Sequence, residues 1–295
     1  EVRLDNLMDS GYLRPFLESG PFSLFSGTGV TERPDTLCAK VSEGRIAILV
    51  DGSPYAILLP CLFSENFQSM DDYAERPYYA VFIRLIKYLA FFLTILLPGC
   101  YVAAVNFHPE LIPDQLLFRI AEAEQDMAFP LMFQALLIHF IYELMREAGL
   151  RLPRPVGHAV SIIGALVIGD AAVTAGLIST PMVMVVALTT ISSFVIPSLY
   201  EPVTLLRLLF ILLGGTLGLY GVVLGLAFVG VNLCSVTVLG VPATSPETPL
   251  SLYSLRDTLI RVGWRQLGQE QFIISRTAGA DQNGEPADQN REGQP

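Results

Sequence analysis

The stretch "VFIRLIKYLAFFLTILLPGCYVAAV", residues 81–105, decides the fold class of this chain. As a helix, this mostly apolar run is long enough to cross a hydrocarbon core about 30 Å thick. Arg84 and Lys87 lie near its first end, and Tyr78 and Tyr79 precede it. Charged and aromatic residues at the end of an apolar run are typical of a membrane interface. We therefore expect a membrane-spanning helix at this position.

The composition of the whole chain agrees with a membrane protein. Of its 295 residues, 52% are hydrophobic and 16% are charged, and the mean hydropathy is +0.51. A soluble domain usually has about a quarter of its residues charged. The net charge of −10 argues against a nucleic-acid partner, because binding phosphates requires a basic surface. This composition fits a protein that lies largely within membrane lipid.

Motifs for catalysis or cofactor binding are missing from the sequence. The four cysteines form no C-x-x-C pair and have no metal-ligand spacing. H-E-x-x-H, G-x-S-x-G and a phosphate-binding glycine loop are also lacking. We therefore expect no catalytic residue, no metal and no cofactor, and we do not expect an enzyme.

Further apolar runs extend the membrane prediction. They occupy residues 131–147, 156–178, 181–197 and 203–240. The last run carries one charge, Arg207, and as a single helix would extend nearly twice the thickness of the hydrocarbon core. It must go out and return, either as two short spans or as one span plus a re-entrant piece. The sequence thus predicts an α-helical multi-pass membrane protein with five to six spanning segments.

The distribution of arginine and lysine predicts the topology. Basic residues gather before the first span, at 146–154, at 200–207 and in the C-terminal segment, whereas 106–130 and 179–180 are poor in them. Because cytoplasmic loops carry the excess of Lys and Arg, both soluble ends should be cytoplasmic. The same rule favours a spanning helix at 131–147 over one that lies on the membrane surface.

Four regions follow from this organisation. We expect residues 1–78 to be the C-terminal portion of a small cytoplasmic α/β domain and 79–240 to be the transmembrane helical domain. Residues 241–276 should form a cytoplasmic C-terminal segment. The polar, Gly- and Pro-containing stretch 277–295 is typical of a disordered tail. The chain begins with Glu1 rather than Met, so we expect it to continue a longer protein.

Local signals locate elements within the first region. Asp51-Gly52 lies between the β-prone runs "RIAILV" and "YAILLP", which predicts a β-hairpin. The tripeptide Glu-Arg-Pro occurs at 32–34 and again at 75–77. Because Pro keeps the preceding residue extended, each copy should mark the entry into a new element.

Polar side chains within the apolar runs are the candidate functional residues, because ionisable groups in a membrane tend to face a partner or a water-filled cavity. The ion-path candidates are His139, Glu143, Glu147, Asp170, Thr189 and Ser193. The first three are spaced by four residues and share one helix face.

Each candidate also has a structural interpretation. His139, Glu143 and Asp170 can make polar contacts between helices, and Glu147 can be solvated or paired at the interface. Thr189 and Ser193 either hydrogen-bond to their own helix or line a pore. Asp170 does not indicate an intramembrane aspartyl protease, because no second aspartate lies in another span.

Small residues indicate close helix packing. Gly214 with Gly218, and Gly221 with Gly225, form two G-x-x-x-G units seven residues apart, which we interpret as one helical face. Ala165 and Gly169 make a similar pair in the earlier run 156–178. These faces serve either internal packing or a subunit interface.

Long stretches of the chain resemble a known family. They are "ERPDTLCAKVSEGRIAILVDGSPYAILLP" (32–60), "ERPYYAVFIRLIKYLAFFLTILLPGCYVAAVNFHPELIP" (75–113), "FIYELMREAGLRLPRPVGHAVSIIGALVIGDAAV" (140–173) and "VPATSP" (241–246). They resemble the A subunit of the GerA-type spore germination receptors, and the similarity runs from about residue 5 to residue 265. Glu143, Arg146 and Glu147, followed by Ala-Gly, match the family's glutamate-bearing helix. Asp170 and His139 depart from the family pattern but remain polar.

The resemblance implies a multi-pass protein of the inner membrane of bacterial spores. It also implies two partners, a transporter-like B subunit that binds the nutrient and a lipoprotein C subunit. The A subunit would form a homo-oligomeric channel that releases monovalent cations on germinant sensing. Two alternatives stay open at this point: a non-conducting membrane scaffold of the receptor, and a stage V sporulation paralogue that amplifies ion release.

Overall fold

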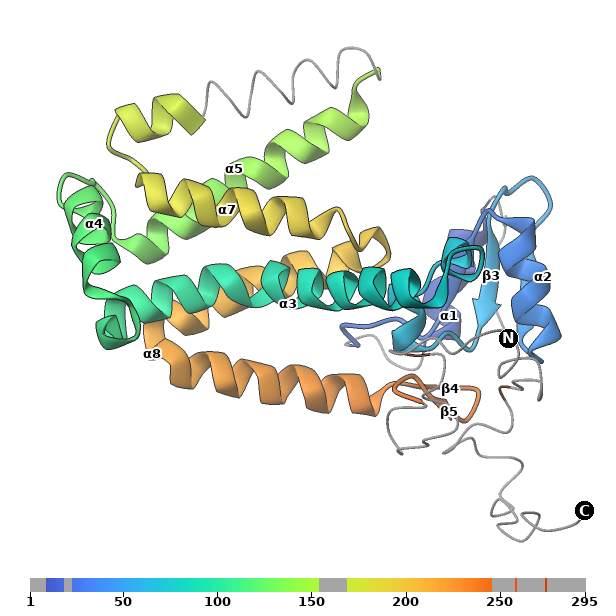
Figure 1. Cartoon of the computed structure of the whole chain (residues 1–295). Coiled ribbons are helices and arrows are strands. Elements are labelled where there is room, and N and C mark those ends of the chain that lie inside the picture. Colours follow the sequence, from blue (N-terminus) through green and yellow to red (C-terminus); the bar gives the residue numbers. More distant parts are fainter. Residues whose placement is uncertain (1–8, 19–22, 154–168, 246–257, 259–273, 275–295) are drawn as a thin grey trace, which may run out of the picture. The chain divides into compact units, whose positions relative to one another are not determined.

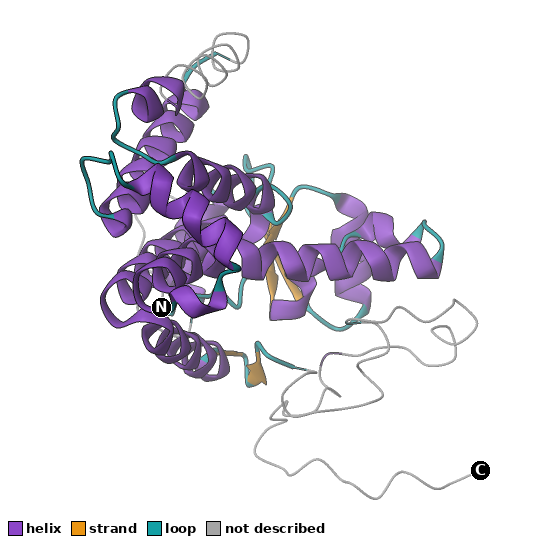
Figure 2. Cartoon of the chain, turned by 60° about the vertical axis from the view of Figure 1, so that its left-hand side comes forward, coloured by secondary structure: helices purple, strands orange, loops and turns teal. Residues whose placement is uncertain are grey.

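Helices form most of the described chain, and its strands are short (Figures 1 and 2). The computed structural model describes residues 9–18, 23–153, 169–245, 258 and 274. Most of the expected span 156–178, nearly all of the C-terminal segment beyond 245 and the tail 277–295 lie outside the described residues. The expectations for them stay predictions.

The longer helices are α2 (Pro34–Ser42), α3 (Pro77–Phe107), α4 (Asp114–Glu124), α5 (Leu131–Arg151), α7 (Thr180–Ser193) and α8 (Tyr200–Ser235). Short helical turns are η1 (Ser10–Leu13), α1 (Arg14–Leu17), η2 (Phe63–Phe67), η3 (Met70–Tyr73), η4 (Pro109–Leu111) and η5 (Pro197–Leu199). The strands are β1 (Gly29–Thr31), β2 (Ile46–Leu49), β3 (Ala56–Leu59), β4 (Thr237–Val238) and β5 (Val241–Pro242).

The chain divides into two compact units. The sheet-bearing unit consists of Glu1–Ile86 together with Val229–Pro295, and the helical unit consists of Lys87–Phe228. The helices α3 and α8 each continue from one unit into the other along the chain.

A three-stranded antiparallel sheet with the order β1-β3-β2 forms the centre of the sheet-bearing unit. β2 and β3 are the predicted hairpin, and Gly52 in its turn has a φ of +84°. That left-handed conformation is readily adopted by glycine, so the Asp51-Gly52 signal is confirmed. All four side chains of the central strand β3 are buried, and Ile57 and Leu59 pack with Val238 of β4.

Each Glu-Arg-Pro copy marks the entry into a new element, as the sequence predicts, and both elements are helices. The run "TLCAKV" (36–41) after the first copy is β-prone by composition, and its helical structure corrects that expectation. α2 begins at Pro34 and α3 begins at Pro77. Proline suits the first turn of a helix because the amide hydrogen it lacks would have no partner within the helix there. The repeated tripeptide therefore works as a helix start signal in this chain.

A buried charge cluster joins α2 and the strands to η2. The Glu65 carboxylate accepts hydrogen bonds from the Arg45 guanidinium, from Lys40 Nζ at 2.7 Å and from the Leu62 main-chain N–H at 3.1 Å. Burial raises the pKa of the Glu65 carboxyl, but the charges of Lys40 and Arg45 outweigh burial and lower it to about 2. Burial together with the Glu65 charge raises the pKa of the neighbouring Cys61 thiol to about 12.

Arg84 has a different environment from the one expected at a membrane interface. Its side chain is wholly buried in the sheet-bearing unit. Arg84 Nε lies 3.3 Å from Asp72 Oδ2, and its Nη1 donates to the carbonyl oxygen of Thr258 at 3.3 Å. The first turns of α3 are therefore attached to η3 by a buried ion pair.

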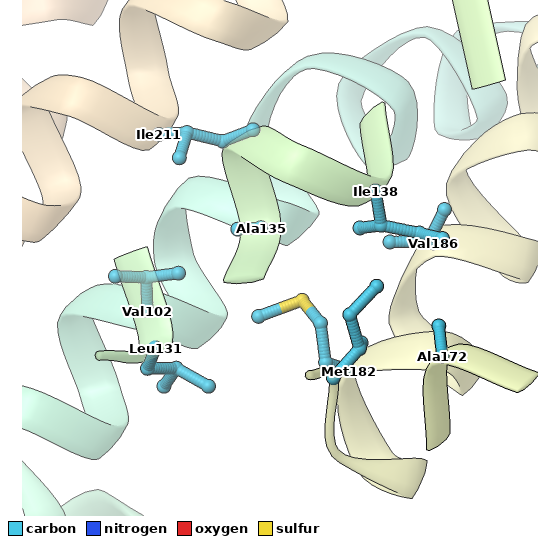
Figure 3. Packing of buried hydrophobic residues seen from close by; sticks show 9 residues of the cluster. Val102, Leu131, Ala135, Ile138, Ala172, Met182, Val186 and Ile211 are labelled. Atoms are coloured by element: carbon cyan, nitrogen blue, oxygen red, sulfur yellow. The ribbon is translucent and has the colours of Figure 1, made fainter. Parts of the chain in front are cut away.

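The helical unit has its apolar core where α3, α5, α7 and α8 meet (Figure 3). The buried members of this core are Val102, Leu131, Ala135, Ile138, Ala172, Ile178, Met182, Val186 and Ile211. Leu131, Ala135 and Ile138 lie on one face of α5, and Met182 and Val186 lie on one face of α7, as in amphipathic helices of a bundle. The opposite faces expose many large apolar side chains, which suits a surrounding of lipid.

Among the described residues, two helical segments are long and apolar enough to cross a membrane: α3, and α8 together with η5. α7 is shorter than the predicted run 181–197, because it ends at Ser193. Its 14 residues rise only about 21 Å, which is less than the hydrocarbon core. The expectation that this run spans the membrane as one helix therefore does not fit the structure. The total number of spans stays a prediction.

α8 is a helical hairpin rather than one straight rod (Figure 1). Gly218 has φ 63° and ψ −150°, a conformation that is essentially confined to glycine. A Cβ atom on Gly225 would lie 2.8 Å from the Phe210 ring. In a straight helix these two residues would be about 22 Å apart along the axis. The first arm ends at Leu217, and the two arms, each about 26 Å long, run side by side.

This hairpin bears on two sequence interpretations, the shared face of the four glycines and the return of 203–240. Gly214, Gly218, Gly221 and Gly225 do not form one continuous helical face, because the chain leaves the helical conformation at Gly218. The predicted return of 203–240 takes the form of two arms of similar length.

Candidate functional site: a charge cluster between α5 and α8

The side chains at 139, 143 and 147 of α5 have three different environments, although they are spaced by four residues. His139 is wholly buried, and its Nδ1 lies 2.8 Å from the carbonyl oxygen of Ala135. Because a carbonyl oxygen only accepts, Nδ1 carries the hydrogen. Glu147 is exposed and accepts hydrogen bonds from Arg151 of the same helix at 2.9 and 2.6 Å. Only Glu143 connects α5 to another helix by an ion pair.

Glu143 is the meeting point of two helices. Its carboxylate accepts a hydrogen bond from Arg207 Nη2 and another from the Tyr200 hydroxyl, both of α8. Arg146, one turn further along α5, lies 3.9 Å from the same carboxylate. The Arg146 guanidinium also lies over the Tyr200 ring, with Cζ 3.0 Å from the ring centroid. A cation against an aromatic face is attractive and adds a second connection between α5 and α8.

Arg207 is the most deeply buried member of this cluster. Its side chain is 0% exposed, although it belongs to a helix apolar enough to cross a membrane. Nη2 binds Glu143, while Nε and Nη1 have no hydrogen-bond partner among the described residues. Two guanidinium groups, those of Arg207 and Arg146, therefore share one carboxylate. Charges in such a position are costly unless paired, and they tend to have functional roles.

The predicted hydroxyl row of α7 is buried and bonded within its own helix. Thr189 donates to the carbonyl oxygen of Val185 at 2.7 Å, and Ser193 donates to that of Thr190 at 2.7 Å. This is the local alternative to a pore lining. Asp170 lies apart from these groups, exposed on the helical segment 169–174.

The small residues have distinct neighbours. Gly214 meets the main chain of Gly99 in α3, and Gly221 meets the carbonyl oxygen of Leu213 in the other arm of the hairpin. A Cβ atom on Gly169 would meet nothing within 4 Å among the described residues, and Ala165 lies outside them. The described part of the chain contains no group of three or more His, Cys, Asp or Glu side chains that could hold a metal ion.

Comparison with known proteins identifies the family. The family model described as "Bacillus/Clostridium GerA spore germination protein" matches residues 1–271. The chain belongs to the GerA spore germination protein family. The resemblance inferred from the sequence is therefore confirmed.

Relatives of this GerA-family chain have been named in Bacillus subtilis (strain 168). "Spore germination protein KA" is 42% identical over 97% of this chain, which covers 54% of the relative. "Spore germination protein B1" is 39% identical over 88% of this chain and 54% of the relative, and "Uncharacterized membrane protein YfkQ" is 37% identical over 95% and 55%. The chain thus spans about half the length of the curated relatives it matches. No solved structure matches it significantly.

Two buried polar positions of the GerA-family chain, Arg207 and Gln134, were not among the sequence candidates. Arg207 was visible as the one charge of the run 203–240, and pairing it with Glu143 would have required knowing that α5 and α8 meet. Gln134 of α5 is wholly buried; its amide nitrogen donates to Glu124 at 2.6 Å, and its oxygen accepts from the Ser179 N–H at 2.8 Å. An amide within an apolar run was the available signal.

Proposed function

We propose that this protein is the A subunit of a nutrient germinant receptor in bacterial spores. The observation that carries the proposal is the match of nearly the whole chain to spore germination proteins, at 42% identity to one of them. The apolar helices α3 and α8 support a location in the spore membrane. On this proposal both soluble ends lie on the cytoplasmic, spore-core side of the inner membrane.

We further propose that several copies of the subunit form a channel for monovalent cations that opens when a germinant is sensed. A transporter-like B subunit and a lipoprotein C subunit would be its partners. Charged and polar groups buried among apolar helices support this role, because such groups are kept in membranes chiefly where ions, protons or conformational states are controlled. Glu143, at the centre of the cluster between α5 and α8, is the residue that we expect to matter most.

The test is potassium release from liposomes that contain the purified receptor complex. Vesicles loaded with potassium are exposed to a panel of amino acids, sugars and nucleosides, and potassium is followed with an ion-selective electrode. We expect release with at least one nutrient, and none from vesicles that carry the partner subunits without this chain. Absence of release under all conditions, from a complex that is intact by size-exclusion chromatography, would reject the channel.

One observation favours a second candidate function, a non-conducting scaffold. Within the protomer Glu143 is ion-paired, and the hydroxyls of Thr189 and Ser193 are bonded within α7. A scaffold would hold the nutrient-binding partner in the membrane by its packed helices. In that case Gly218→Leu would dissociate the complex, and no current would appear with any nutrient.

A further inference from the structure

The first arm of the α8 hairpin is attached to the rest of the helical unit at two places. Near Gly214 the arm packs against α3 through main-chain atoms, with Gly99 as the contacting residue. Seven residues earlier, about 10 Å along the axis, Arg207 binds Glu143 of α5. The first attachment is a close van der Waals contact that tolerates no added atom. The second is electrostatic, and ion pairs of this kind can separate without the helices losing their own hydrogen bonds.

The electrostatic attachment is incompletely satisfied. Arg207 is wholly buried, yet Nε and Nη1 have no partner among the described residues. The single carboxylate of Glu143 serves Arg146 as well, at 3.9 Å. Buried polar networks are less favourable when some of their groups lack a hydrogen-bond partner. The Glu143–Arg207 pair therefore stabilises this arrangement less than a fully hydrogen-bonded pair would. A second arrangement that offers Arg207 water or another acceptor can therefore compete with it.

We propose that the Glu143–Arg207 ion pair is the clasp of the closed receptor: it holds α5 against the first arm of α8, and the pair separates when the receptor opens. Arg207 is thus a positioning residue that acts through Glu143. Tyr200 and Arg146 belong to the same clasp, because the Tyr200 hydroxyl binds Glu143 while its ring lies under Arg146. The inference rests on the proposed receptor function, and of the two experiments below only the first also needs the proposed ion release.

Substituting both charged residues at once distinguishes a clasp from an ion pair with a purely structural role. Removing one partner leaves an uncompensated buried charge, which destabilises most proteins, whereas removing both is often neutral. The informative variant is therefore the double substitution Glu143→Gln with Arg207→Leu. If the pair is only structural, this variant should accumulate and respond to nutrient like the wild type. If it is the clasp, the variant should accumulate but release ions without nutrient.

The first experiment measures potassium release from spores that carry the wild-type chain or the double variant, without nutrient. We expect spontaneous release at least tenfold above wild type from a variant present at wild-type amounts. Arg151→Gln is the matched control, because Arg151 forms an exposed ion pair within α5, two turns from Glu143, and has no ion pair to another helix in the part of the chain that the structure describes. Normal, nutrient-dependent release from an accumulating double variant would overturn the proposal.

A second experiment needs no variant and no ion current. Hydrogen–deuterium exchange of the purified wild-type receptor complex is compared with and without the nutrient panel. Opening of the clasp should raise exchange in 139–146 and in 200–207 together, while the residues around Gly99 and Gly214 keep their protection. Unchanged or slower exchange in both clasp segments, under conditions where nutrient binds, would overturn the proposal even if the double variant fails to accumulate.

The two experiments separate the clasp from the channel. Faster exchange in both segments without any potassium release would reject the channel and keep the clasp. Nutrient-dependent release without a change in exchange would keep the channel and reject the clasp.

Discussion

Gly99 of α3 and Gly214 of α8 lie main chain against main chain. A Cβ atom on Gly99 would stand 2.5 Å from the carbonyl oxygen of Phe210, and one on Gly214 would overlap the carbonyl group of Gly99. Helices approach this closely only where small residues meet, which is how membrane helices gain packing energy in the absence of a hydrophobic driving force. The contact fixes the position of the α8 hairpin within the helical unit.

Gly214→Ala should destabilise the protein. Adding a methyl group to a closely packed interface costs about 1–3 kcal/mol, and here the obstacle is main chain that cannot rotate away. The measurement is the Tm of the purified protein in detergent. Gly230→Ala is the control: Gly230 lies in the same helix, and no described residue comes within 4 Å of its Cβ position. Equal Tm values for the two variants would contradict the contact.

Gly218→Ala should also lower the Tm, for a different reason. Its φ of 63° with ψ −150° costs a non-glycine residue about 1–3 kcal/mol. The Cβ atom would also lie 3.1 Å from Phe107. Gly169→Ala serves as the control because no described residue lies within 4 Å of its Cβ position and its φ is not positive. A Tm of the Gly218→Ala variant that is no lower than that of Gly169→Ala would contradict the hairpin turn at Gly218.

The hairpin should be visible in the membrane topology. Cysteines at position 201 (Glu201→Cys) and at the native Cys234 should react with an impermeant maleimide from one side of the membrane. A cysteine at position 216 (Thr216→Cys), next to the turn, should react only from the other side. All three positions are exposed in the structure, and the remaining cysteines are replaced by serine. Labelling of 201 and 234 from opposite sides would mean a single span.

Gln134→Leu should weaken the junction of α4, α5 and α7. The substitution leaves the buried Ser179 N–H and a Glu124 carboxylate oxygen without their partner. Each buried polar group left unsatisfied costs about 1–3 kcal/mol. Gln125→Leu changes the same kind of side chain at an exposed position and should alter the Tm little. A Gln134→Leu variant as stable as Gln125→Leu would show that the amide carries no such role.

Acid should destabilise the sheet-bearing unit through Glu65. Burial raises the pKa of its carboxyl, yet Lys40 and Arg45 lower it from 4.5 to about 2. A carboxyl with a depressed folded pKa stabilises the protein above the unfolded pKa, so this contribution of about 3 kcal/mol is lost as the pH falls from about 4.5 to about 2. Burial raises the pKa of the Glu43 carboxyl, so protonation of Glu43 at low pH favours the folded state and opposes the effect of Glu65.

The comparison of wild type with Glu65→Gln isolates this contribution. Unfolding is followed in detergent between pH 5 and pH 2, and the variant should show the shallower loss of stability. If stability falls equally steeply with pH in the two proteins, Glu65 is not held as an anion by Lys40 and Arg45.

Local features of the fold were predictable from the sequence because they depend on neighbouring residues. The Asp51-Gly52 hairpin, the entry into a new element at Pro34 and at Pro77, and the long apolar helix after Pro77 follow from backbone preferences and from hydropathy. The helical state of 36–41 does not, because that run is β-prone by composition. The requirement that 203–240 turn back came from its length alone. The family, too, was recognisable from long stretches of sequence.

The candidate site was only partly predictable, because its partners are far apart in the chain. Glu143 was visible as an acid in an apolar run, but 64 positions separate it from Arg207. Nothing local to Arg207 indicates which helix it meets. Likewise, the spacing of Gly214 and Gly218 suggested one helical face, until the φ of Gly218 revealed that the helix turns there.

The sequence by itself thus determined which segments are long and apolar enough for a membrane and to which family the chain belongs, because these properties are sums over neighbouring residues. Only the tertiary structure decided that Glu143 faces Arg207 and that Gly214 faces Gly99. Such pairings depend on how helices pack after the chain has turned, because a buried charge needs an opposite charge beside it and two main chains come into contact only where small residues meet.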